Sequence, residues 1–133
     1  VASTITDVSG SSEIVDRCFV TYANSAKTDI LGVAEELLRE HGAVSEPVVR
    51  AMAEGCLRAS GADHAIAVSG IAGPSGGSVE KPVGTVYIGI ASRSCETFAK
   101  RYFSPSGRIS FKSRVTRLAL DLLRRRLCGF SLD

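Results

Sequence analysis

The chain has 133 residues, of which 44% are apolar and 23% are charged, and its formal net charge is +2. This length fits a single domain with a real hydrophobic core, and the composition is ordinary for a globular protein. No apolar run approaches the roughly 18 residues that span a bilayer, so we expect a soluble, unexported, cytoplasmic protein without a membrane partner.

Cysteine and histidine usage predicts neither a disulfide framework nor a metal site. The four cysteines are spread along the chain without a Cys-x-x-Cys pair: Cys18, Cys56, Cys95 and Cys128. This spacing is typical of reduced, mostly buried thiols in a cytosolic protein. The two histidines are isolated from each other and from any cysteine pair, so metal ligation is not expected.

Basic residues concentrate in the last third of the chain, ending in the run Arg124, Arg125 and Arg126. We interpret them as a solvated helix face, because aromatic residues do not interleave with the charges as they do in many nucleic-acid surfaces. A nucleic-acid partner is therefore not expected, and salt-sensitive DNA binding that is lost on neutralising this run would be needed to support one.

The first part of the chain alternates helix and strand signals. Residues 1–10 have the pattern of the last turns of a helix, with Gly10 as the stop signal. Residues 18–22, CFVTY, are β-branched and aromatic and predict a strand. Asn24 is then a candidate cap for a helix over residues 25–33. This order places Tyr22 and Lys27 at one strand-to-helix corner.

Two further helices follow. A short one over AEELLREHG ends at Gly42, and a second, from Glu46 to about Ser60, has Ser45 as its candidate cap and Gly61 as its end. Residues 65–69 and 85–91 are short apolar runs that predict buried strands, residues 96–103 predict an edge strand, and an amphipathic helix closes the chain. This order predicts an α/β fold: a single three-layer α/β/α domain, residues 1–133, with a mixed sheet.

A glycine-rich loop, residues 69–84, separates the first two of these buried strands. It lacks the Gly-Lys-Ser/Thr of an ATP-binding loop and the G-x-G-x-x-G of a dinucleotide fold, and Lys81 is followed by Pro82 and a strand rather than a helix. Consecutive glycines with free N–H groups still form nests that bind phosphate or an oxyanion. The alternative is an elaborate turn, but a structureless loop of this length favours a function.

Tyr22 and Lys27 are five residues apart, which rules out the Tyr-x-x-x-Lys pair of short-chain dehydrogenases. A lysine near a serine can instead act as a base when its surroundings lower its pKa. Ser12, which follows the Gly10 stop in an exposed corner, is the serine to consider. By itself, however, a Gly-Ser-Ser sequence is more often a turn, and a lone lysine is more often a surface charge.

Several segments together resemble one family. TDVSGSS (6–12), FVTYANSAK (19–27), LGV (31–33), HGAVSEPVV (41–49) and above all SGIAGPSGGSVEKPVGTV (69–86) closely resemble the C-terminal domain of the competence-damage-inducible protein CinA, the family of nicotinamide-nucleotide amidases. The resemblance covers essentially the whole chain, and the long glycine motif is highly specific. Gly107-Arg108 stands where the family has Gly-Asp-Arg.

The resemblance implies hydrolysis of the carboxamide of nicotinamide mononucleotide to nicotinic acid mononucleotide and ammonia, with no metal or other cofactor. It implies that Ser12 is the nucleophile and Lys27 its base, with Tyr22 and Ser69 as supporting hydroxyls. It further implies six substrate-binding residues. Arg108 and Lys112, at the C-terminal helix, are candidates to bind the substrate phosphate. The other four lie in the glycine-rich segment: Gly70, Gly73, Gly76 and Gly77. Such a pair is chemically coherent, because a neutral lysine both activates serine and returns its proton to the departing ammonia.

The family carries a Glu-Ser-Cys-Thr-Gly-Gly segment before the residues that match Val1 and Ala2, and this chain begins just after it. The resemblance implies that this segment lines the site and that a strand before it belongs to the sheet. We predict an amidohydrolase of the pyridine-nucleotide cycle, and the alternative is a non-catalytic nucleotide-binding or assembly domain of the same fold. We also expect a homo-oligomer, for example a dimer.

Overall fold

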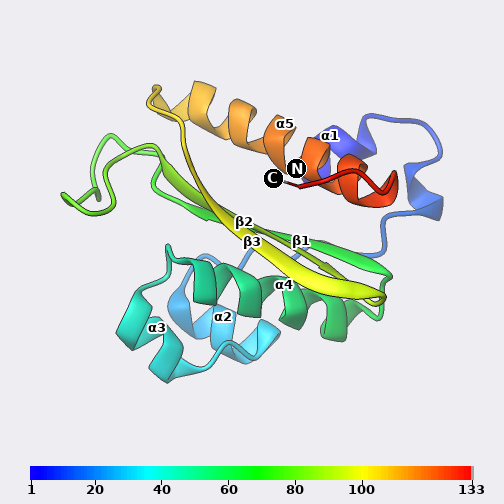
Figure 1. The fold of residues 1–133 in the computed structure, drawn as a ribbon, viewed down its shortest axis with the longest axis horizontal. Helices are drawn as coiled ribbons and strands as arrows, with labels where there is room; N and C mark the ends of the chain where they lie inside the picture. The colour runs from blue at the N-terminus through cyan, green and yellow to red at the C-terminus, as the bar shows by residue number, and fades with distance from the viewer. Residues whose placement is uncertain (133) are drawn as a thin grey trace.

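A three-stranded antiparallel sheet forms the middle layer of the computed structural model, which describes residues 1–132. Its strands follow the order of the chain: β1 (His64–Gly70), β2 (Thr85–Ser92) and β3 (Cys95–Phe103). Figure 1 shows α5 on one face of this sheet and α4, with α2 and α3 beneath it, on the other. The predicted α/β fold with three layers is confirmed.

The helices cover both faces of the sheet and include one short 3-10 turn, η1. Their bounds are α1 (Ala2–Thr6), η1 (Ser11–Glu13), α2 (Asn24–Leu31), α3 (Glu35–His41), α4 (Glu46–Ser60) and α5 (Arg108–Leu127). None of the helices within residues 1–132 is both long enough and apolar enough to cross a membrane.

The side chains of β2 alternate between two separate cores, as the period of a strand requires. Val86, Ile88 and Ile90 pack with the apolar side of α5, whereas Ala91 belongs to the core on the α4 side. Gly89 also faces α4, where an added Cβ would lie 2.8 Å from a backbone oxygen of that helix. The sheet therefore holds α4 and α5 in fixed positions on either side.

The prediction of a mixed sheet is wrong, because all three strands described pair antiparallel. Residues 18–22, the predicted additional strand, have no strand partner. Thr21 is buried and Phe19 packs on the core, while Val20 and Tyr22 are 87% and 86% exposed. Strand-forming residue types indicate a surface that can be half buried, but they do not specify a neighbour to pair with.

One of the two predicted N-cap residues is confirmed and the other is wrong. Ala23, not Asn24, is the N-cap residue of α2, and Asn24 is its first helical residue. Ser45 is the N-cap residue of α4 as predicted, but its hydroxyl does not cap the helix. It donates instead to Gly42 O at 2.8 Å. The predicted helix ends at Gly42 and Gly61 are confirmed.

The four cysteines are free, as predicted, but they are not mostly buried. Cys18, Cys95 and Cys128 are exposed and Cys56 is intermediate. Cys18 lies in the segment without a strand partner, Cys95 begins β3 and Cys128 follows α5, so all three lie outside the two cores.

Candidate functional site

The glycine-rich arm, residues 71–84, projects from the end of the sheet where β1 stops and β2 begins (Figure 1). At its base Ile71 N donates to Thr85 O, and Ile71 O accepts from the opposite limb, each at 2.8 Å. Further out the limbs touch, since a Cβ on Gly73 would lie 2.5 Å from Cγ1 of Val83. Glycine is therefore needed there for close approach, and the predicted loop between two strands is confirmed.

Three glycines of the arm have backbone N–H groups that donate to no acceptor within residues 1–132: Gly73, Gly76 and Gly77. Gly73 and Gly76 have φ values of 71° and 92°, which favour glycine. Gly70, the remaining glycine of the predicted set, is the last residue of β1 and packs closely against the start of β2. Gly73 is buried, whereas the exposed Gly76 and Gly77 present unpaired donors of the kind that bind anions.

Arg108, the first residue of α5, reaches back to the arm, where Nη1 donates to Gly73 O at 3.0 Å. Its other guanidinium N–H groups have no partner within residues 1–132. Lys112 lies one helical turn later, is exposed, and likewise has no partner in this part of the chain. Both cations therefore remain free to pair with an anionic ligand.

Lys27 is buried in the first turn of α2, with 6% of its surface exposed. Its Nζ donates to three successive carbonyl oxygens, those of Thr21 (2.9 Å), Tyr22 (3.1 Å) and Ala23 (3.4 Å). Burial lowers the pKa of Lys27 below its ordinary value of 10.5, because desolvation disfavours the ammonium. The carbonyls oppose this shift, since an ammonium supplies three donors and a neutral amine only two.

The hydroxyls of Tyr22 and Ser69, the predicted supporting groups, differ in exposure and in hydrogen bonding. The Tyr22 side chain is 86% exposed, and only its backbone oxygen contacts Lys27. Ser69 is buried near the end of β1, and its Oγ donates to Ala43 O at 2.7 Å. The Ser69 hydroxyl keeps its acceptor lone pairs, whereas the Tyr22 hydroxyl is directed by no protein contact within residues 1–132.

Ser12 lies far from Lys27. It sits in η1, is exposed, and its hydroxyl makes no hydrogen bond within residues 1–132. Figure 1 shows this blue segment at the opposite end of the molecule from the start of α2, with residues 14–23 running between them. The predicted roles of nucleophile and base require a hydrogen bond between Ser12 Oγ and Lys27 Nζ. It is not formed in this structure, where Nζ donates to three backbone carbonyls instead.

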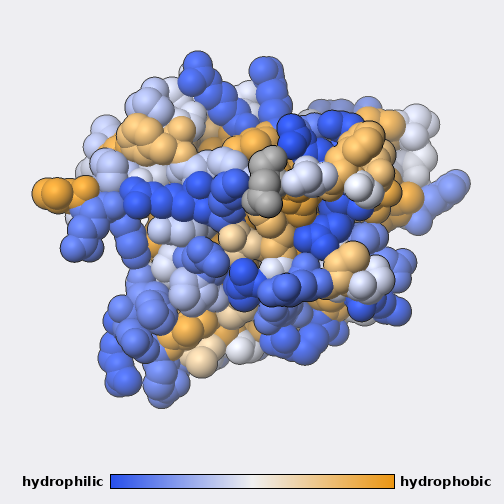
Figure 2. Space-filling view, viewed as in Figure 1, coloured by the Kyte–Doolittle hydropathy of each residue, from blue (hydrophilic) through white to orange (hydrophobic). Residues whose placement is uncertain are grey.

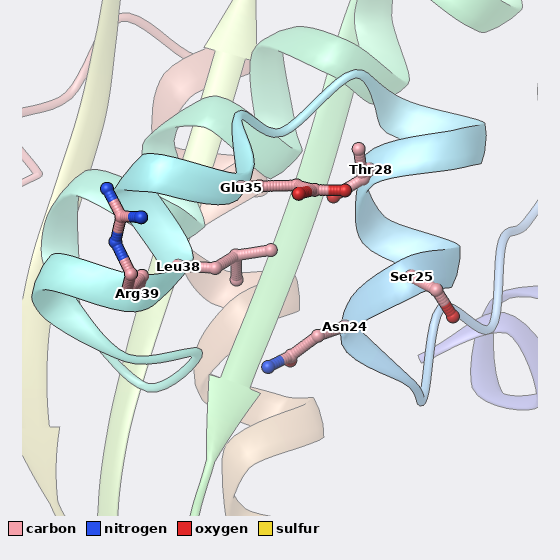
Figure 3. A pocket seen from close by; sticks show the side chains of 6 residues that line it. All are labelled: Asn24, Ser25, Thr28, Glu35, Leu38 and Arg39. Carbon is pink, nitrogen blue, oxygen red and sulfur yellow. The ribbon is translucent and has the colours of Figure 1, made fainter.

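A hollow of about 290 Å³ lies between α2 and α3 and contains none of the predicted site residues. Figure 3 shows Asn24, Thr28, Glu35 and Leu38 reaching into the space between the two helices, while Arg39 points away from it. Among residues 1–132, no group of three or more His, Cys, Asp or Glu side chains is arranged to hold a metal ion.

The run of arginines at the end of α5 makes contacts within the domain. Arg124 and Arg125 both pair with Asp121, at 2.8 and 2.9 Å. Arg126 Nη1 donates to Glu96 O at 3.2 Å. Part of the basic charge of this helix is therefore used in intramolecular pairing.

Comparison with known proteins establishes the family. A family model described as the CinA C-terminal domain matches residues 1–127. The chain belongs to this family. The solved structures that resemble the CinA domain include a competence/damage-inducible protein from Agrobacterium tumefaciens, with a TM-score of 0.89 and 45% identity over 92% of this chain and 74% of that one. Another, from Klebsiella pneumoniae, has a TM-score of 0.91 and 35% identity over 98% of this chain and 80% of that one.

This chain covers a small share of some curated relatives and most of others. A CinA-like protein of Akkermansia muciniphila is 55% identical over 120 residues, which are 90% of this chain but 29% of that protein. The nicotinamide-nucleotide amidohydrolase PncC of Escherichia coli is 50% identical over 123 residues, 92% of this chain and 74% of that protein. The CinA domain therefore spans under a third of the first relative and about three quarters of the second.

Two basic residues that no sequence pattern indicated as functional hold the arm of the CinA domain. Lys81 Nζ donates to His41 O at 2.8 Å, and Arg101 Nη2 donates to Glu80 O at 2.9 Å. The sequence excludes Lys81 as the lysine of an ATP-binding loop and indicates no other role for it. Arg101 is one of the basic residues that concentrate in the last third of the chain. A sequence signal for such a contact is the position of Lys81 in a long glycine-rich loop. Few apolar residues are present there to hold the loop by packing, so polar contacts are needed.

Proposed function

We propose that this CinA domain is a nicotinamide-nucleotide amidohydrolase, which converts nicotinamide mononucleotide and water to nicotinic acid mononucleotide and ammonia. The observation that carries this proposal is the 50% identity, over 92% of the chain, to the Escherichia coli protein named nicotinamide-nucleotide amidohydrolase PncC. The unpaired N–H groups of the arm and the free donors of Arg108 support it, because this substrate carries a phosphate.

The proposed chemistry is a two-step acyl transfer. A serine Oγ bonds to the carboxamide carbon while Lys27 accepts its proton, and the carbon–nitrogen bond then breaks as this proton passes to the departing ammonia. Water next hydrolyses the acyl ester and releases the carboxylate. Lys27 must be neutral to act, and its burial favours that form.

Ser12 takes the nucleophile's role only if it reaches Lys27, and within this chain η1, which carries Ser12, lies apart from α2, which carries Lys27. The homo-oligomer expected from the sequence provides a route, in which Ser12 of one copy meets Lys27 of another. We expect Ser12→Ala and Lys27→Met each to lose ammonia release and their mixture to regain part of it. Full activity of Ser12→Ala would remove Ser12 from the mechanism.

The test of the function is ammonia release from nicotinamide mononucleotide by the purified protein, with nicotinic acid mononucleotide identified as the second product. Nucleotide binding without ammonia release would instead support the non-catalytic domain. Neither binding nor turnover would reject both functions.

Arg108→Met is expected to raise KM for nicotinamide mononucleotide by about 10-fold or more, because a charge-assisted hydrogen bond to phosphate is lost. kcat is expected to change little, since the phosphate does not react. Nicotinamide riboside, which lacks the phosphate, provides the control. The same KM increase with both substrates would contradict a phosphate contact at Arg108.

A further inference from the structure

The turn between α3 and α4 accepts hydrogen bonds at three successive backbone carbonyls. His41 O accepts from Lys81 at 2.8 Å, Gly42 O from Ser45 at 2.8 Å, and Ala43 O from Ser69 at 2.7 Å. These donors come from three places: the arm, the start of α4 and the end of β1. The turn therefore joins the arm to the strand end that carries Ser69 and to the helical layer that carries Lys27.

Lys81 makes the contact that links the outer part of the arm to this turn. His41 is the last residue of α3, so its carbonyl lies at the negative end of the helix and favours a cation. Lys81 is itself fixed by a small turn, in which Ser78 N donates to Lys81 O and Lys81 N donates to Ser78 Oγ, both at 3.0 Å. The ammonium is thus presented to the turn from a defined backbone position.

Apolar burial does not hold the outer arm in place. Residues 74–80 are all exposed, and Val79 is 100% exposed. Figure 2 shows an apolar patch at the tip of the arm and hydrophilic surface behind it. With no core contact beyond the base, the orientation of the outer arm depends on its hydrogen bonds, those of Lys81, Arg101 and Arg108.

These three cations make no salt bridge within residues 1–132, and each donates to a backbone carbonyl. Arg101 and Arg108 hold Glu80 O and Gly73 O, which both belong to the arm. Lys81 alone among them extends from the arm to a helix on the α4 side of the sheet. Removing its ammonium would leave the arm attached to the sheet and α5 but released from the layer that contains Lys27.

We propose that Lys81 is a positioning residue for the amidase site, which holds the unpaired N–H groups of Gly76 and Gly77 in place by binding the carbonyl at the end of α3. The inference rests on the proposed function for its kinetic consequence. Its structural consequence, a fixed arm, is independent of any activity.

Three variants test the role of Lys81. Lys81→Met keeps most of the side-chain length and removes the donor, Lys81→Arg keeps the cation and the donor, and Arg39→Met removes a charge from the same end of α3 without touching the arm. Amide hydrogen exchange of Ser78 and Lys81, the amides of the outer arm that donate hydrogen bonds, is the first measurement, and KM and kcat for nicotinamide mononucleotide are the second. Thermal unfolding reports whether each variant is folded.

In Lys81→Met we expect exchange in the arm to accelerate by about 10-fold or more, the factor associated with a charge-assisted hydrogen bond. KM should rise about 10-fold with kcat nearly unchanged, because the arm binds the part of the substrate that does not react. Lys81→Arg and Arg39→Met should retain slow exchange and the original KM.

Unchanged arm exchange in folded Lys81→Met would overturn the proposal, as would equal acceleration in Arg39→Met. A lower unfolding temperature with unchanged exchange and KM would show a role in stability alone and would also overturn it. If the unaltered protein releases no ammonia, the proposed function fails, and the exchange measurement still decides whether Lys81 fixes the arm.

Discussion

Lys27→Met is expected to lower kcat for nicotinamide mononucleotide by about 10³-fold, the range typical of a missing general base. Methionine keeps an unbranched side chain in the buried site but removes the donor to three backbone carbonyls, so we expect a folded protein of lower stability. Ammonia release, with circular dichroism to verify folding, is the measurement. Activity within about tenfold of the unaltered protein would contradict the assignment of Lys27 as the base.

The pH dependence provides a second measurement of Lys27. Because burial lowers its pKa below 10.5, kcat/KM should rise as the pH increases through that lowered value. Stability should follow the same direction: between the folded pKa and 10.5 the unfolded state binds more protons, so the free energy of unfolding rises with pH. We expect the difference between the unaltered protein and Lys27→Met to grow with pH in favour of the former over this window.

Gly55→Ala is expected to destabilise the domain by about 3 kcal/mol, the upper end of the usual range for overpacking a core. Gly55 lies inside α4, where an added Cβ would sit 2.0 Å from Leu31 O, a backbone atom at the end of α2. The two helices must separate to accept it. Urea denaturation measures the change, which is a large part of the roughly 5–15 kcal/mol that stabilises a typical domain.

Gly107→Ala is the matched control for Gly55→Ala. Gly107 precedes α5, has an ordinary φ of −57°, and an added Cβ there would meet nothing within 4 Å. We expect a loss of at most about 1 kcal/mol, because Gly107 is the N-cap residue of α5, where alanine is less favourable than glycine. Equal stability of the two variants would contradict the close contact of α2 and α4.

Local signals in the sequence predicted most elements because their causes are local. The helix from Glu46 to Ser60 has the predicted bounds, since an apolar stripe and a terminal Gly61 identify it without reference to other elements. β1 and β2 extend one or two residues beyond the predicted runs. The strand predicted at residues 18–22 is not formed, and here the cause is not local. Strand pairing depends on a partner elsewhere in the chain.

The glycine motif likewise identified the family, which the family model confirms. The roles of individual side chains did not follow from it. Lys81 and Ser69 are separated in sequence from the turn at residues 41–43, so their shared contact with it appears only once the chain is folded.

By itself the sequence determined the layered α/β class, the position of the glycine-rich arm and the family. Tertiary structure decided that the sheet is antiparallel, that Ser12 and Lys27 make no hydrogen bond with each other, and that Lys81 donates to the last carbonyl of α3. Gly55 shows the physical reason. Helix propensity alone predicts that alanine is better there by about 1 kcal/mol, whereas the approach of Leu31 O, which no local pattern contains, reverses the sign.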